Sequence, residues 1–561
     1  MAESFDAIVI GSGISGGWAA KELCEKGLKT LLLERGRMIE HPKDYTTATL
    51  EKWELPHRGE GTVKEKMDSP VQSTIYAWGE ASKQYFVIDK EHPYIQKKPF
   101  GWIRSYQLGG RSLVWGRQSY RIGDIDFEAN AKDGHGVDWP IRYKDIAPWY
   151  SYVEKFAGIS GAKENLFQLP DGEFQPAMEM NVVEKEVKKR LEKEYPDRKF
   201  IMGRIANLTK EIGHRQRCQY RNRCHLGCPF GAYFSSNSST LPAAIATGNL
   251  TIRPFSIAME ILYDKDKRKA IGVRITDSQT KEIKEYFARI IFLNASTVAS
   301  AAILLNSRSD VFPHGMGNNY AQVGHNFINH HVGAGASGTI DGFEDKYYYG
   351  RRANGPYLPR FRNIGEKTDH GFLRGYGFQC NAEREGFGRS NDEFGIGVSL
   401  KDNLSEPGKW IMSYGGFGEV LPYYDNMISL HPEQKDQWGM PLVVIDAEIK
   451  DNEKKMRTDM VNSAAEMLER TGFKNIKTYD RALEPNARVL SVHEMGTARM
   501  GRDPKTSVLN AWNQLHDVPN VFVTDGSCMT SSACQNPSLT YMALTARACD
   551  FAVSELKKRN L

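Results

Sequence analysis

Cysteine is scarce in this sequence, with eight residues in 561, which is too few for a scaffold of disulfides. No apolar run approaches the roughly 18 to 20 residues of a membrane-spanning helix, so no transmembrane segment is expected. Neither sign of charge dominates, because 74 basic and 69 acidic residues leave a net charge of +5. This balance gives no support for nucleic acid as the main partner. Residues 1–4 lack a basic region, which predicts no signal peptide.

The composition that remains is that of an ordinary globular protein. Hydrophobic residues make up 40% and charged residues 25% of the chain, which excludes a disordered, collagenous or coiled-coil protein. A chain of this length buries a sizeable core without help from disulfides. At roughly 150 residues per domain, the length predicts three or four domains, or two large ones.

The clearest motif lies in the first forty residues. Residues 5–10 are apolar and β-branched, which predicts a buried strand, and the G-x-G-x-x-G from Gly11 to Gly16 follows directly. After a helical stretch, residues 30–33 predict a second buried strand that ends at Glu34. Glu34 lies 18 residues after Gly16, about where this type of fold places the acid that binds a ribose.

Each position of the glycine motif has a physical reason. Gly11 permits a tight turn, Gly13 lets the backbone approach a pyrophosphate, and Gly16 allows the helix to pack closely on the strand. Ile14 and Ser15 begin the helix, whose free N–H groups and positive dipole favour phosphate. The motif predicts a bound dinucleotide and does not choose between FAD and NAD. Only one such motif follows a buried strand, so one dinucleotide is expected.

Other elements indicate a discontinuous α/β fold. Further helices are predicted over residues 18–26, 181–195, 295–306, 452–472 and 538–556, and further strands over 288–293 and 521–524. Residues 330–450 alternate aromatic and glycine-rich segments, which indicates a mainly β or mixed region. Because dinucleotide-type elements occur at the start and the end, we expect a Rossmann-type domain with an inserted α+β domain that faces the cofactor.

Four further stretches complete a pattern along nearly the whole chain. They are GGRSLVWG at 109–116, VGHNFINH at 323–330, HEMGTARMG at 493–501, and VTDGS at 523–527 followed by NPSLT at 536–540. In this order, and with the N-terminal motif, they resemble the glucose–methanol–choline (GMC) family of flavin oxidoreductases. Two positions differ from the usual pattern, since Trp115 stands where many members have Asn and Ser296 where many have Gly.

The resemblance implies FAD and the transfer of a hydride from an alcohol carbon to the flavin. His493 matches the base of the family, and Asn536 matches the partner of that base. A histidine with an ordinary pKa of about 6.5 can accept a proton at neutral pH. An asparagine can donate one hydrogen bond to the developing alkoxide. His330 and His331 are interpreted as structural residues.

The resemblance also implies where the flavin and the domains lie. The expected flavin contacts, beyond the N-terminal motif, are Gly109, Gly110, Ser112, Trp115, Asp525, Gly526, Asn536 and Pro537. The expected FAD-binding domain comprises 1–45, 85–130, 215–315 and 485–561, and the expected substrate domain comprises 131–214 and 316–484. Some members attach the flavin through a histidine within 104–117, and this chain has none there, so non-covalent FAD is expected.

Three cysteines form a cluster with the spacing C-x5-C-x3-C-P, namely Cys218, Cys224 and Cys228. A zinc site could add His214 or His225, although the usual C-x2-C pair is missing. Disulfides suit an odd number of cysteines poorly. An iron–sulfur cluster is the third interpretation, since a final cysteine followed by proline is typical of ferredoxins and three thiolates suit a 3Fe-4S cluster.

The resemblance to one subgroup favours the iron–sulfur interpretation. Bacterial membrane-linked sugar dehydrogenases of the GMC type carry a similar C-x5-C-x3-C-P-x-G-A, often with a doubled first cysteine where this chain has Gln219. The expected substrate is a sugar or glycoside, with C3 of glucosides first. Aldose 1-dehydrogenase and polyol or gluconate dehydrogenase activities are the alternatives. Residues 347–349 and 351–352 are candidate sugar contacts.

An iron–sulfur centre passes electrons on singly, which predicts a dehydrogenase and not an oxidase. The subgroup implies a small subunit that carries an export signal, and a cytochrome c or another electron acceptor. Location in the periplasm by co-export is therefore expected, with the cytoplasm as the alternative. A hypothesis of another class is a non-catalytic flavin redox carrier, which the presence of His493 and Asn536 disfavours.

Overall fold

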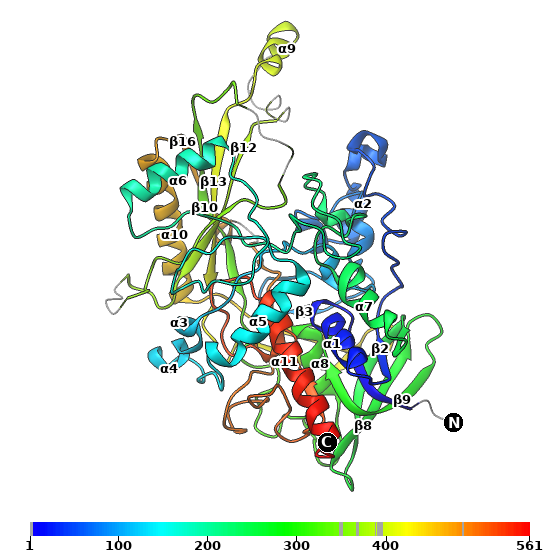
Figure 1. Cartoon of the computed structure of the whole chain (residues 1–561). Helices are drawn as coiled ribbons and strands as arrows, with labels where there is room; N and C mark the ends of the chain where they lie inside the picture. The colour runs from blue at the N-terminus through cyan, green and yellow to red at the C-terminus, as the bar shows by residue number, and fades with distance from the viewer. Residues whose placement is uncertain are drawn as a thin grey trace.

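Two large sheets organise the chain. The computed structural model describes residues 4–346, 350, 352–365, 370–386, 389, 396–484 and 487–561. Figure 1 shows one sheet in the lower right of the molecule, near both termini, and the other in the upper left. The result is the α/β architecture that the sequence predicts, with a Rossmann-type sheet and a second, antiparallel sheet.

The first sheet draws its strands from the beginning, middle and end of the chain. Its order in the described residues is β6 (Leu250–Arg253), β2 (Thr30–Leu33), β1 (Ser4–Ile10), β9 (Ile283–Leu293), β8 (Lys269–Asp277) and β7 (Ser256–Asp264), with β18 (Val521–Val523) beside β9. Strands β6, β2, β1, β9 and β18 run parallel, whereas β8 and β7 form an antiparallel extension. Strand β2 is buried along its whole length, as a parallel strand covered on both faces requires.

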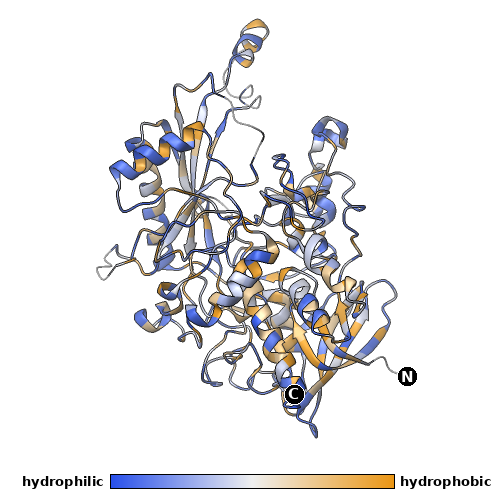
Figure 2. Cartoon of the chain, viewed as in Figure 1, coloured by the Kyte–Doolittle hydropathy of each residue, from blue (hydrophilic) through white to orange (hydrophobic). Residues whose placement is uncertain are grey.

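Helices cover this sheet and join segments that are distant in sequence. They are α1 (Ile14–Glu25), α5 (Tyr143–Ala157), α7 (Leu241–Ala246), α8 (Thr297–Asn306) and α11 (Ser538–Lys557). In Figure 1, α1 in blue lies beside α11 in red, and these two helices contact each other. Hydrophobic residues concentrate along the neighbouring strands in Figure 2. Seven of these elements were predicted, and the structure confirms them within about five residues. They are β1, β2, β9, β18, α1, α8 and α11.

The second sheet is antiparallel throughout its described strands. Its order is β16 (Lys474–Asp480), β10 (His330–Ile340), β13 (Trp410–Glu419), β12 (Tyr376–Arg384), β11 (Pro356–Leu358) and β5 (Ile201–Met202). Helices α10 (Asp451–Arg470) and α6 (Val182–Glu194) pack on this sheet or beside it. Met456, Met460 and Met467 line the buried face of α10 and reach the same hydrophobic cluster as Trp410. The predicted helices over 181–195 and 452–472 are confirmed.

Further short elements complete the described structure. They are β3 (Ile95–Gln96) with β14 (Met427–Lys435) and β15 (Pro441–Asp446), the pair β4 (Phe100–Trp102) and β17 (Val489–Ser491), and the short helices α2 (Val63–Asp68), α3 (Asp124–Phe127), α4 (Ala129–Asp133) and α9 (Val398–Ser405). None of the helices in the described part of the chain has both the length and the apolar composition of a membrane span. The domain boundaries given above stay a prediction.

Candidate active site

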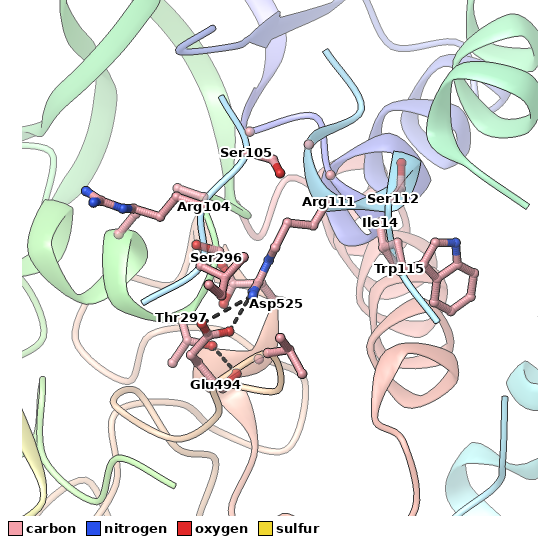
Figure 3. Close-up of a pocket in the computed structure, with 18 of the residues that line it drawn as sticks. Ile14, Arg104, Ser105, Arg111, Ser112, Trp115, Ser296, Thr297, Glu494 and Asp525 are labelled. Carbon is pink, nitrogen blue, oxygen red and sulfur yellow. Dashed lines mark hydrogen bonds and ion pairs between the residues drawn. The ribbon is translucent and has the colours of Figure 1, made fainter. Parts of the chain in front are cut away.

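A cavity of about 630 Å³ lies beside the carboxyl ends of the parallel strands β1 and β2. Its wall combines the turn after β1, the turn at 110–117, the segment 493–494 and the residues that lead into α11. Open α/β sheets bind their ligands at this end of the strands. Figure 3 shows that Arg111 extends from one of these segments toward Glu494 of another, with Ser296, Thr297 and Asp525 close to them.

The glycines of the first turn have the separate roles that the motif predicts. Gly11 has a φ of 93°, and a Cβ atom at Gly16 would stand 1.8 Å from the carbonyl oxygen of Gly11. Gly16 is therefore a packing residue and does not line the cavity. A Cβ atom at Gly13 would meet no protein atom within 4 Å, so the open side of this residue faces the cavity. Ile14 and Ser15, at the start of α1, line the same wall.

Glu34 lies at the end of β2, as predicted, and lines the cavity. Its Oε1 accepts a hydrogen bond from the Gly36 amide at 2.8 Å, and its Oε2 accepts from the Ser12 amide at 3.2 Å and from the Ser12 hydroxyl. Burial raises the pKa of the Glu34 carboxyl above its ordinary value. The network holds the carboxylate at the cavity wall, where it can accept from a ribose hydroxyl.

The second glycine turn packs against the first. The Gly109 amide donates to the Ser12 hydroxyl at 2.8 Å, and Gly109 itself has a φ of 90° and does not line the cavity. Gly110, Ser112 and Trp115 do line it, and the Trp115 indole donates to the Phe234 carbonyl at 2.8 Å. The turn therefore places one of the predicted residues in a packing role and three at the wall.

The C-terminal stretch closes the same wall. Asp525 accepts from the Ser300 hydroxyl at 2.6 Å and from the Ser527 amide at 2.9 Å, and burial raises the pKa of its carboxyl. Gly526, Asn536 and Pro537 also line the cavity, and Pro537 is the N-cap of α11. The predicted flavin residues of this stretch thus share one cavity with the N-terminal motif.

Unsatisfied polar atoms test whether this cavity suits a dinucleotide. Buried wall atoms without a hydrogen-bond partner among the described residues include Arg35 Nε, His92 Nδ1, Arg104 Nε, Ser105 Oγ and Asn294 Nδ2. Buried polar atoms normally have partners, so such a row of donors and acceptors indicates a polar ligand. Together with the open space at Gly13, this wall fits FAD.

His493 and Asn536 meet at the edge of the cavity. The Nε2 atom of His493 lies 3.3 Å from the amide nitrogen Nδ2 of Asn536, although the two residues are 43 positions apart. Burial lowers the pKa of His493 well below its ordinary value, and His330 and Arg111 contribute to the same shift. The imidazole is therefore neutral at pH 7, which is the state that a proton acceptor requires.

His330 and Gln379 hold this pair, although the sequence predicts no chemical role for either of them. His330, interpreted as structural, approaches His493 with its Nδ1 atom 2.8 Å from the Nδ1 atom of His493. Gln379 on β12 donates from Nε2 to the Asn536 Oδ1 atom at 2.8 Å. The signal available in the sequence is that His330 closes the VGHNFINH stretch at 323–330, whereas no local pattern marks Gln379.

A third unpredicted contact is the ion pair between Arg111 and Glu494. The guanidinium reaches across from the turn at 110–113 and meets both carboxylate oxygens, at 3.2 Å and 2.6 Å (Figure 3). The Glu494 side chain is 1% exposed and that of Arg111 is 29% exposed. Glu494 directly follows His493, so it neutralises the charge of Arg111, the cation that faces the base. The ion pair also joins the turn at 110–113 to the segment 493–494 across the cavity.

The three clustered cysteines lie together around a separate cavity of about 30 Å³. Burial raises the pKa of the Cys218 thiol to about 11 and also raises that of Cys228. No group of three or more metal-binding side chains in the described residues is arranged for a single metal ion. Of the histidines considered for a zinc site, His214 faces the Ser238 carbonyl and His225 lines the large cavity.

Of the candidate sugar contacts at 347–349 and 351–352, the structure describes Arg352. Residues 347–349 and 351 lie outside the described residues. Arg352 pairs with Glu184 of α6 and does not line the cavity. Gln379, which contacts Asn536, and Phe417, whose ring centroid lies 6.1 Å from that of His493, line the cavity instead.

Comparison with known proteins agrees with this geometry. Sequence profiles of the GMC oxidoreductase family match residues 5–332 and 422–545. A 2-methyl-1,2-propanediol dehydrogenase of Mycolicibacterium austroafricanum is 27% identical over 571 residues, covering 98% of this chain and 95% of that protein. The fructose dehydrogenase large subunit of Gluconobacter japonicus is 23% identical over 575 residues, covering 99% of each chain.

A solved structure shows the same fold. Formate oxidase of Aspergillus oryzae RIB40 superposes with a TM-score of 0.63 at 13% identity, covering 99% of each chain. The N-terminal profile alone spans more than half of the present sequence. The chain therefore belongs to the GMC oxidoreductase family and is an FAD-dependent oxidoreductase that acts on CH–OH groups.

Proposed function

We propose that the protein is a dehydrogenase that oxidises a secondary hydroxyl of a sugar or glycoside, with C3 of a glucoside as the first candidate. The observation that carries this proposal is the His493–Asn536 pair at the edge of the dinucleotide-type cavity. Gln379 places an uncharged amide beside this pair at the cavity wall, which suits a neutral polyhydroxyl substrate. The similarity to a fructose dehydrogenase supports the sugar class.

The site accounts for both hydrogens that the alcohol loses, one from the hydroxyl and one from the carbon. The Nε2 atom of His493 accepts the hydroxyl proton, and the Asn536 amide donates to the same oxygen as negative charge develops on it. FAD, when bound, supplies the acceptor for the hydride that leaves the carbon. The O–H bond breaks as its proton moves to His493, and the C–H bond breaks as a hydride leaves with both electrons. A carbonyl forms, so the substrate has lost one proton and one hydride. The neutral Arg111–Glu494 pair leaves the base free of an adjacent net charge.

Cys218, Cys224 and Cys228 are proposed to hold an iron–sulfur cluster of the 3Fe-4S type. Their shared cavity supports this, as do the Tyr220 amide 3.4 Å from the Cys218 sulfur and the Asn207 amide nitrogen 3.8 Å from the Cys224 sulfur. N–H groups directed at sulfur tune such clusters. A cluster supplies one-electron transfer to a partner, which is why we favour a dehydrogenase over an oxidase.

A partner protein and an exported location complete the proposal. The relative from Gluconobacter japonicus is named a large subunit, which supports assembly with further subunits. We propose a small subunit that carries an export signal, a cytochrome c or another electron acceptor, and a periplasmic location by co-export. Co-purification of the chain with its genomic neighbours, followed by fractionation of the cell, tests this part.

Turnover of methyl glucoside with an artificial acceptor tests the reaction. Its C1 hydroxyl is blocked, so formation of a 3-keto product supports the proposal and excludes an aldose 1-dehydrogenase. Oxidation of diols or gluconate alone would favour the polyol or gluconate alternative, which the 2-methyl-1,2-propanediol dehydrogenase relative supports. A flavin that no sugar or polyol bleaches would favour the carrier. Anaerobic purification with iron, sulfide and EPR analysis tests the cluster, and zinc without iron would contradict it.

A further inference from the structure

The base and its partner are both held by side chains from the antiparallel sheet. His330 begins β10 and contacts His493, while Gln379 lies on β12 and contacts Asn536. These two holding contacts join residues that are 163 and 157 positions apart. Each leaves one atom of the held residue facing the cavity, so the contacts decide which atom that is.

The hydrogen bonds of His330 fix the tautomer of His493. The Nε2 atom of His330 lies 2.9 Å from the Ala533 carbonyl oxygen, which can only accept, so this nitrogen carries the proton. Burial lowers the pKa of His330 to about 4, so the ring is neutral and its Nδ1 atom is an acceptor. The neutral His493 must then donate from Nδ1, which leaves the lone pair on Nε2.

The hydrogen bond of Gln379 fixes the orientation of the Asn536 amide. An N–H group of Gln379 needs an acceptor, and it finds the Oδ1 atom of Asn536 at 2.8 Å. The Asn536 amide therefore turns its Nδ2 donor toward the His493 Nε2 atom. Arg111 is the charged side chain that faces His493, and Glu494 neutralises it, so no free charge competes with this arrangement among the described residues.

We propose that His330 and Gln379 are positioning residues that preset one lone pair, on His493, and one N–H donor, on Asn536, for a substrate hydroxyl. A substrate hydroxyl that approaches both atoms from the cavity gives its proton to the lone pair and receives the hydrogen bond of the donor. The inference rests on the proposed role of His493 as the base. It adds that the second sheet, and not the flavin-binding sheet, sets the polarity of the site.

The variant Gln379→Glu tests the polarity directly. A carboxylate of nearly the same shape can only accept, so Asn536 must turn and present its oxygen to the substrate. Loss of one such donor lowers kcat by about 100-fold or more. Activity is expected to recover as the pH falls through the pKa of the new carboxyl, because a protonated glutamate donates again. Gln379→Leu is the matched control, with a smaller loss and no recovery at low pH.

His330 is tested by replacement of its acceptor atom. His330→Asn places an amide oxygen near the position of Nδ1 and is expected to keep most activity, whereas His330→Leu removes the acceptor and loses at least about 10-fold in kcat. NMR of ¹⁵N-histidine-labelled protein, assigned with His493→Asn, reports the tautomer without turnover. The wild-type protein should show Nε2 of His493 unprotonated at pH 7, and His330→Leu should show a mixture.

The outcomes separate this inference from the proposed function. If the wild-type flavin is bleached by a sugar or polyol but Gln379→Glu and Gln379→Leu behave alike at every pH, the positioning roles are wrong and the function stands. A proton on Nε2 of His493 in the wild-type protein overturns the role of His330. A wild-type flavin that no alcohol bleaches overturns the proposed function and this inference with it. FAD content of each variant, measured by absorbance, controls for misfolding.

Discussion

Alanine at Gly13 should remove FAD binding while the apo fold stays intact. The backbone of Gly13 has φ −62° and ψ −163°, which any residue can adopt, and a Cβ atom there meets no protein atom within 4 Å. The new methyl group would instead occupy the part of the cavity that faces the start of α1, where phosphate oxygens are expected. The perturbation therefore acts on the ligand and not on the chain.

The size of the effect follows from the hydrogen bonds that a displaced phosphate would lose. Each hydrogen bond to a charged group contributes about 1.5–3 kcal/mol, so the loss of one or two gives about 3 kcal/mol. This corresponds to roughly 100-fold in the dissociation constant. At an FAD concentration about 100 times the wild-type dissociation constant, FAD should stabilise the wild type by about 2.7 kcal/mol and the variant by about 0.4 kcal/mol.

Two assays decide the matter, titration of the apoprotein with FAD by fluorescence and denaturant unfolding with and without FAD. Gly386→Ala is the matched control, because its Cβ also meets no atom within 4 Å and it lies outside the cavity. It should leave FAD binding unchanged. Gly16→Ala should instead destabilise the apo chain, because its Cβ would collide with the Gly11 carbonyl. Unchanged FAD affinity in Gly13→Ala would refute the placement of the dinucleotide.

Three further predictions concern charge and metal. Removing one partner of a buried ion pair costs about 3–5 kcal/mol. Because Arg111 is 29% exposed, a smaller coupling energy of about 1–2 kcal/mol is expected from a double-mutant cycle of Arg111→Met and Glu494→Gln measured by denaturant unfolding. Additive effects of the two substitutions would contradict the pair. Because burial lowers the pKa of His330 to about 4, its contribution to stability is present above pH 6.5 and is lost as the pH falls toward 4, by up to about 1.4 kcal/mol per unit. The free energy of unfolding should therefore depend on pH in the same way for wild type and His330→Asn above pH 6.5. Below pH 6.5 it should fall more steeply for the wild type. Cys224→Ser should lose iron and slow the reduction of one-electron acceptors while substrate still bleaches the flavin; unchanged acceptor rates would contradict the cluster.

Local patterns in the sequence were sufficient for the flavin-binding half of the site. The run from β1 through the glycine turn to Glu34 depends on contacts among near neighbours and, at Gly11, on a positive φ that glycine adopts readily. Burial of apolar strands and amphipathic helices follows from periodicity in the same way. These elements therefore lie close to their predicted ranges.

The contacts around the base could not be predicted in this way. The Arg111–Glu494 pair joins residues 383 positions apart, and the Gln379–Asn536 contact joins one sheet to the segment that leads into α11, a helix that covers the other sheet. Such contacts depend on how the two sheets meet, which hydrophobic periodicity does not specify. Sequence alone favours a structural role for His330, because a histidine without a visible partner is usually structural and its partner His493 lies 163 positions away.

The most direct test of the account is anaerobic mixing of the FAD-loaded protein with a panel of sugars, glycosides and polyols. We predict that at least one bleaches the wild-type flavin, and that His493→Asn retains FAD but is bleached about 100-fold more slowly or worse, because it lacks the base. Bleaching of His493→Asn at the wild-type rate, or a purified chain that holds no flavin, would contradict the account.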